Sequence, residues 1–248
     1  MAGQTNSKRT RIEPVFGWFE KQRQDVSWPS RLLELADGLT GFPDPGDLRS
    51  LTFRKEVAVE ASGCRLAWMI QNVEQLAPHD GRQWMELRQR AHHAKREQAL
   101  DALRAGSRDD VPKKLILEGP TNSDCVIDCA RAVIWVEGKR NDWLAPSTKW
   151  DVIRDQLARN LEAALILASQ RSELEPKDFC VLVLHENPLK HHERLLVDGY
   201  REGTWTGGFP HLGEGTRKLF QTRIGTLTWT RLAEEWPALK EYLQTATG

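Results

Sequence analysis

The sequence predicts an α/β fold in which helices cover a mixed β-sheet. Two short apolar segments, residues 124–129 and 132–136, lie close enough in the chain to pair as an antiparallel hairpin. An amphipathic helix is predicted over residues 151–168, and a strand with apolar residues on both faces over 179–184. A strand, a crossover helix and a further strand indicate parallel pairing beside the hairpin, which makes the sheet mixed.

The remaining segments are expected to extend this sheet or to cover it. Alternating apolar residues predict a strand over 51–59. Another strand is predicted over 114–117, just before the hairpin. Apolar spacing and terminal residues predict helices over 29–38, 66–76, 81–104 and 230–243, a short strand over 223–229 and a loop-rich segment over 186–215. We therefore expect a mostly helical N-terminal part, residues 1–110, packed on an α/β core, residues 111–248.

The composition is typical of a globular protein and does not identify a binding partner. Of the 248 residues 40% are hydrophobic and 28% charged, and no apolar run approaches the roughly 20 residues that a membrane helix needs. The polar, basic start, MAGQTNSKRTRIEP, has no apolar segment typical of a secretory signal, so a cytoplasmic protein without membrane contact is expected. The 35 Lys and Arg balance the 35 Asp and Glu, which neither supports nor excludes nucleic-acid binding, because a neutral total can contain a basic face.

The hairpin carries acidic residues at the open end of its two strands. If the turn is centred on residues 130–131, Asp124 lies directly opposite Glu137, with Cβ atoms about 4.5–5.5 Å apart. Lys139 is two residues further along and projects from the same face. Asp128 shares this face but lies nearer the turn. The register therefore selects Asp124 as the partner of Glu137.

Two opposed carboxylates beside apolar strands are costly without a compensating cation. Mg²⁺ favours carboxylate oxygens and keeps several waters, and a metal-bound water can act as the nucleophile on a phosphodiester. Lys139 is suited to orient that water or to offset charge in the transition state. The alternative is a surface hairpin in which Asp124, Glu137 and Lys139 are simply solvated.

The segment SD-CVIDCARAVIWV-EGK resembles the PD-(D/E)xK nuclease superfamily, whose members have the restriction-endonuclease-like fold. Asp124 matches the first acid of the motif, and Glu137 and Lys139 match the (D/E)xK group. Ser123 stands where the family has proline. The resemblance covers about residues 113–184 and implies a three-layer αβα arrangement, here with a helical N-terminal extension.

The resemblance also implies residues that support the site. Gln156, at the beginning of the helix after the hairpin, corresponds to positions where many members place a supporting Gln or Lys. A further acid normally comes from an upstream element, for which Glu86, Glu97 and Glu118 are candidates. The expected catalytic residues are Asp124, Glu137, Lys139 and Gln156, and the expected metal ligands are Asp124, Glu137, Glu118 and Glu97.

The function implied by the resemblance is Mg²⁺- or Mn²⁺-dependent hydrolysis of phosphodiester bonds, with DNA as the expected substrate and a partner subunit or homodimer compatible with the neutral charge. One alternative is a catalytically inactive nuclease-like domain that binds nucleic acid or a partner protein. Another is a metal-dependent hydrolase that uses a histidine-rich zone. That zone lacks the spacing of helical zinc motifs and consists of His185, Glu186, His191, His192, Glu193 and His211.

Overall fold

The structure is a computed structural model. It describes residues 11–22, 25, 27–42, 52–139, 144–170, 177–186, 189, 191–205 and 207–244. The first ten residues, for which a polar terminal sequence predicts disorder, lie outside this described part. In the described part, every helix is too short or too polar to cross a membrane.

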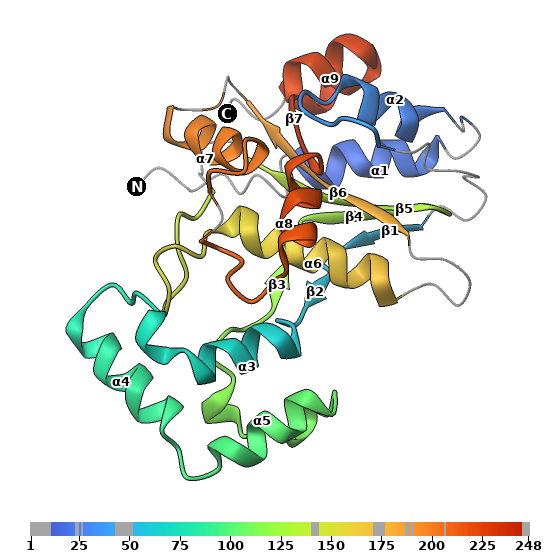
Figure 1. Cartoon of the computed structure of the whole chain (residues 1–248). Coiled ribbons are helices and arrows are strands. Elements are labelled where there is room, and N and C mark those ends of the chain that lie inside the picture. Colours follow the sequence, from blue (N-terminus) through green and yellow to red (C-terminus); the bar gives the residue numbers. More distant parts are fainter. Residues whose placement is uncertain are drawn as a thin grey trace, which may run out of the picture.

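A five-stranded mixed sheet forms the centre of the molecule, as the sequence predicts (Figure 1). In spatial order its strands are β1 (Thr52–Lys55), β4 (Cys125–Asp128), β5 (Ala132–Gly138), β6 (Asp178–His185) and β7 (Ile224–Thr228). The first three pair antiparallel, whereas β5, β6 and β7 are parallel. Helix α6 (Gln156–Gln170) makes the crossover between β5 and β6. A second, two-stranded sheet pairs β2 (Ala58–Val59) with β3 (Thr121–Asn122).

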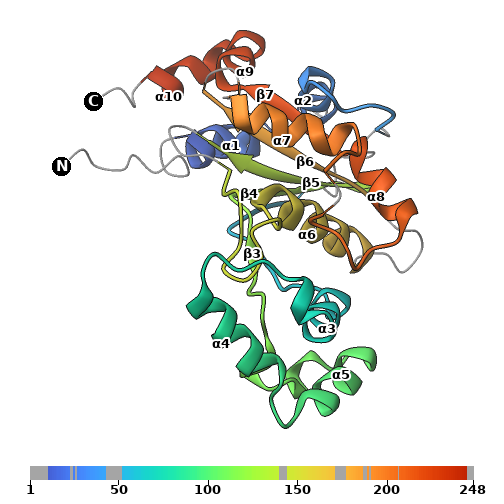
Figure 2. The same ribbon diagram turned by 60° about the vertical axis from the view of Figure 1, so that its left-hand side comes forward.

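Helices cover both faces of the large sheet, so the arrangement has three layers (Figures 1 and 2). One face packs against α1 (Glu13–Lys21), α2 (Trp28–Leu35) and α9 (Trp229–Glu235), which η6 (Pro237–Leu239) and α10 (Lys240–Gln244) follow. The other face packs against α6, α7 (His191–Arg201) and α8 (Glu214–Gln221).

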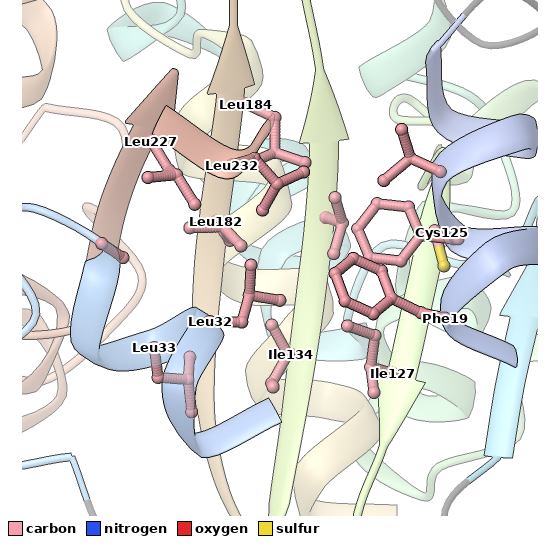
Figure 3. Packing of buried hydrophobic residues seen from close by; sticks show 14 of the residues in the cluster. Phe19, Leu32, Leu33, Cys125, Ile127, Ile134, Leu182, Leu184, Leu227 and Leu232 are labelled. Carbon is pink, nitrogen blue, oxygen red and sulfur yellow. The ribbon is translucent and has the colours of Figure 1, made fainter. Parts of the chain in front are cut away.

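Strand alternation explains the two cores, because successive side chains point to opposite faces. Figure 3 shows the first core, where Phe19 of α1 and Leu32 of α2 pack over Ile127, Ile134 and Leu182 of the strands. The intervening strand residues form the second core with α6. The central strands are therefore apolar on both faces, as their continuous apolar sequences predict.

A helical lobe lies beside helix α6 and has its own apolar core (Figure 2). It contains α3 (Gly63–Gln71), η3 (Val73–Gln75), α4 (Gly81–Ala91), α5 (Arg96–Arg104), η4 (Arg108–Asp110) and η5 (Lys113–Leu115). The lobe takes up only α3 to η4 of the expected N-terminal part, and it also includes η5, which lies beyond the expected boundary at residue 110. Strand β1 and helices α1 and α2 belong to the layers of the main sheet.

Of the four strands predicted outside the hairpin, those over 179–184 and 223–229 are confirmed as β6 and β7, whereas the other two differ from the structure. The expected strand over 51–59 is two short strands in different sheets, and Glu56, at their junction, has a φ of 53° in the left-handed region. The expected strand over 114–117 is wrong. Leu115 and Leu117 alternate because both anchor the lobe core, and the segment begins with the 3₁₀ turn η5.

The single helix predicted over 81–104 is also wrong, since the chain forms α4 and α5 with a break at residues 92–95. The break lets Leu87 of α4 and Leu100 of α5 reach the same core around α3, which one straight helix would not allow. Similarly, the segment 186–215 contains helix α7, because burial of Val197 and Tyr200 outweighs the weak local preference around Gly199.

We predict that Leu182→Ala lowers the free energy of unfolding by about 2–5 kcal/mol, because it leaves a cavity in the first core. Urea denaturation measures this change. The control is Leu195→Ala on α7, whose side chain is 57% exposed and whose substitution should change stability by about 0.5 kcal/mol or less. Equal losses in the two variants would contradict the described core.

Candidate active site

The hairpin has the predicted register. Cys125 pairs with Val136, and Asp128 pairs with Val133, so the next position places Asp124 beside the end of β5. The backbone N–H of Gly138 donates a hydrogen bond to Asp124 Oδ2 at 2.8 Å. The structure therefore brings the Asp124 carboxylate to the (D/E)xK segment, as the sequence argument requires.

Glu137 lies buried at the end of β5, facing α6, and is only 4% exposed. Its Oε1 atom accepts a hydrogen bond from Gln156 Nε2 at 2.7 Å and lies 2.9 Å from Lys139 Nζ. Its Oε2 atom accepts a longer hydrogen bond, 3.3 Å, from Asn160 Nδ2. Three polar side chains therefore fix the orientation of one buried carboxylate.

Burial raises the pKa of Glu137 to about 7, because the charged form loses hydration. Lys139 opposes this shift, whereas the negative charge of Asp124 adds to it. The two carboxylates thus make each other's ionisation unfavourable in a place where a cation would favour it. This is the electrostatic environment that suits a positive ion between Asp124 and Glu137.

Lys139 and Gln156 are held from several sides. Lys139 Nζ donates to Gln156 Oε1 at 3.2 Å, and the same oxygen accepts from the backbone N–H of Ala145 at 3.0 Å. The backbone of Lys139 is fixed by a bond from its N–H to Leu184 O at 2.6 Å and by Trp229 Nε1, which donates to its carbonyl at 3.0 Å. The structure thus assembles Asp124, Glu137, Lys139 and Gln156 at one end of the sheet.

Gly138 allows a close approach at this end of the strand. A Cβ atom added there would lie 2.6 Å from side-chain atoms of Ile12, well inside normal contact distance. Ile12, the residue that precedes α1, therefore packs against Gly138 on the face of β5 opposite to Glu137 and Lys139. Helix α1 and the site are held together through this contact.

Asn160 is a site residue that sequence reasoning missed. It is fully buried and lies one turn after Gln156 in α6, so both amides reach the same carboxylate. Its Oδ1 atom has no hydrogen-bond partner in the described part of the structure. The available signal was the spacing of two amide side chains, Gln156 and Asn160, at positions i and i+4 of the predicted helix.

Glu118, an expected metal ligand, has another role in the structure. It is buried and lies 3.1 Å from Arg65 Nε of α3 and 3.1 Å from Arg154 Nη2. Burial alone would raise its pKa, but Arg154 and Arg65 hold the pKa below its usual value. Arg154 also pairs with Glu162 at 2.7 Å, and Arg65 with Asp151 at 2.9 Å. Glu118 belongs to an ion network that joins the lobe to α6.

The other two candidate acids, Glu97 and Glu86, also bind partners other than Asp124 and Glu137. Glu97 is exposed and bonds to Arg96 at 2.8 Å. It belongs to α5, which Figure 1 shows in the lobe. Glu86 pairs with Arg90 and Lys149. Across the described ranges, no group of three or more His, Cys, Asp or Glu side chains is arranged to hold a metal ion. The predicted four-carboxylate set is therefore not assembled.

The pair Asp124 and Glu137 nevertheless fits one divalent ion of the Mg²⁺ type. Such ions are commonly bound through one or two protein carboxylates, with waters and substrate phosphates completing the coordination. Asp124 directly precedes β4, Glu137 lies at the end of β5, and the nearby amides of Gln156 and Asn160 support Glu137. The fit rests on this donor set and on the unfavourable mutual charge of the two acids.

The histidine-rich zone does not form a metal centre in the described part of the chain. His211 has a side chain that is 1% exposed, and its Nε2 lies 3.1 Å from Glu162 in the ion network. His191 and His192 are exposed in the first turn of α7, while Glu193 accepts a hydrogen bond from Leu144 N–H at 3.3 Å. His185 of β6 and the side chain of His211 are therefore buried, whereas His191 and His192 are surface residues.

No protein-family model, curated protein or solved structure matches this chain.

We predict that Glu118→Gln destabilises the fold by about 1.5–3 kcal/mol, because it removes a charged partner from two buried arginines, Arg65 and Arg154, which then keep Asp151 and Glu162. The matched control is Glu97→Gln, which removes an exposed acid and should change stability by about 0.5 kcal/mol or less. Chemical denaturation measures both. A destabilisation by Glu97→Gln as large as that by Glu118→Gln would contradict these assignments.

Proposed function

We propose that this protein is a metal-dependent nuclease that hydrolyses phosphodiester bonds, with DNA as the expected substrate. The observation that carries the proposal is the convergence of Asp124, Glu137 and Lys139 at the end of the hairpin, with Gln156 bonded to both Glu137 and Lys139. These four residues are the ones that the resemblance to the PD-(D/E)xK superfamily selects.

We further propose that the fold is restriction-endonuclease-like. An antiparallel hairpin carries the motif, a crossover helix follows it, and the next strand lies parallel beside β5. Helices on both faces add the two outer layers. The resemblance implies a four-stranded mixed sheet flanked by helices, and the five-stranded sheet is compatible with that core.

The residues of the site have separable tasks. Asp124 and Glu137 would hold the ion, and Gln156 and Asn160 keep the Glu137 carboxylate in one orientation. When bound, a divalent cation lowers the pKa of a water and offsets negative charge on the phosphate. Lys139, a buried cation 2.9 Å from Glu137, places a positive charge where the transition state becomes more negative.

The low exposure of the site strengthens these electrostatic effects. Glu137 and Lys139 are both less than 10% exposed, so water screens their charges little. Donors that are already held in place lose little energy to reorientation when the reaction occurs. An arrangement kept rigid by α6 and by the backbone contacts of Lys139 is therefore suited to catalysis as well as to binding.

We predict that the purified protein cleaves plasmid or single-stranded DNA with Mg²⁺ or Mn²⁺ and not in EDTA. Glu137→Gln and Lys139→Met should each lower the cleavage rate about 100-fold or more, because each removes a charge next to the reacting phosphate. Gel electrophoresis of the products measures the rate.

The control for this experiment is Asp128→Asn. Asp128 lies on the same strand face but is paired with Lys177 near the turn, at 2.9 Å, so cleavage per folded molecule should be unchanged. Cleavage that is absent in the wild type, or equal in wild type and Glu137→Gln, would overturn the nuclease proposal. Absent cleavage would favour the inactive nuclease-like domain.

A further inference from the structure

A cleft lies between the helical lobe and the core. Its larger part is a cavity of about 460 Å³ lined by Arg90, Glu118, Gly119, Lys149, Trp150 and Arg159. A second cavity of about 310 Å³ is lined by Glu86, Gln89, Arg90, His93 and Lys114. Arg90 belongs to both, so the two cavities adjoin each other along helix α4.

Two short stretches of chain link the cleft to the candidate active site. Arg159 lies in α6 between Gln156 and Asn160, the residues that bind Glu137. Gly119, on the other wall, is followed by the short strand β3 that leads to Asp124. Figure 2 shows this segment running from the lobe up to the sheet. Because both stretches are short, a nucleic-acid strand several nucleotides long would extend from the cleft to the end of β5.

Arg159 carries a positive charge that its surroundings compensate poorly. Its Nη2 donates to the carbonyl of Pro120 at 2.7 Å, but its Nε has no hydrogen-bond partner within the described ranges. The nearest carboxylate, Glu118, lies 3.7 Å away and is already paired with Arg154 and Arg65. Burial lowers the pKa of Arg159, which indicates that the charged form is short of stabilising partners.

The opposite wall adds two cations that share one carboxylate. Arg90 lies 2.7 Å and Lys149 3.3 Å from Glu86. Both cations also lie over the ring of Trp150, at 5.4 and 4.0 Å from its centroid, which holds them at the cleft. Over both cavities the described lining residues include four cations, Arg90, Lys114, Lys149 and Arg159, against two acids, Glu86 and Glu118, so the walls carry an excess of positive charge.

We propose that this cleft binds phosphate groups of the nucleic-acid strand whose scissile bond lies at Asp124 and Glu137. The inference rests on the proposed nuclease function and assigns substrate binding to residues of the lobe and of α6 outside the catalytic motif. Arginine suits a phosphate because its planar guanidinium donates paired hydrogen bonds to phosphate oxygens. Free phosphate or a mononucleotide has the same chemistry, so the test must distinguish these ligands from a strand.

The test measures binding of labelled single-stranded and duplex DNA to the full chain by fluorescence anisotropy in EDTA, where no cleavage occurs. Arg159→Gln and Lys149→Gln should each weaken binding about tenfold, comparable to the loss of a hydrogen bond between charged groups. Each should also reduce the slope of log affinity against log salt by about 0.7–0.9. Inorganic phosphate and a mononucleotide are tested as competitors and should compete only at far higher concentration than unlabelled DNA.

The matched control is Arg88→Gln. Arg88 lies in the same helix as Arg90 but outside the cleft, paired with Glu74 and placed over the Trp84 ring, so affinity should be unchanged. Lys149 is 53% exposed, so its substitution should preserve folding, which thermal unfolding verifies. This keeps the test decisive even where Arg159→Gln disturbs its contact with Pro120.

Several outcomes would overturn the inference. Unchanged affinity in Lys149→Gln and in folded Arg159→Gln, or an equal loss in Arg88→Gln, would show that DNA does not bind in the cleft. Phosphate binding without DNA binding would show that the occupant is a small anion. Metal-dependent cleavage that depends on Glu137, together with unchanged binding by the cleft variants, would overturn this inference and leave the proposed function intact.

Discussion

The arrangement of the site depends on keeping one carboxylate, that of Glu137, buried at the end of a central strand. A charge in this place is unfavourable without partners, which is why burial raises its pKa. Lys139, Gln156 and Asn160 compensate by bonding to it, and this requires α6 to begin beside the end of β5. The crossover that makes the sheet mixed is thus the same element that makes the buried acid tolerable.

A second buried set of charges holds the lobe against this core. Arg65 of α3 bonds to Glu118, Glu118 bonds to Arg154, and Arg154 bonds to Glu162 of α6. Because each charge is satisfied only while the lobe and α6 stay together, the network keeps the intervening cleft in place. The chain thus uses buried ion pairs twice, once to orient a candidate catalytic group and once to position the surface that we propose for the substrate.

The hairpin could be predicted from sequence because strand pairing has a period of two and a short turn leaves one register, so Asp124, Glu137 and Lys139 came together as expected. Contacts between residues that are far apart in the chain could not be predicted in this way. Glu118 was expected near the metal, but its partners Arg65 and Arg154 are 53 and 36 residues away in the chain, and no local pattern shows such a pairing. The break after α4 contains no glycine or proline and follows only from packing around α3.

The central claim is that Asp124 and Glu137 together hold a divalent cation. Anomalous X-ray scattering from crystals soaked in Mn²⁺ tests it most directly, since the peak locates the ion without relying on activity. The account predicts one strong peak in contact with both carboxylates in the wild type, and its loss in Asp124→Asn. A wild-type crystal at saturating Mn²⁺ with no peak between these two residues, or with the peak at another site, would contradict it.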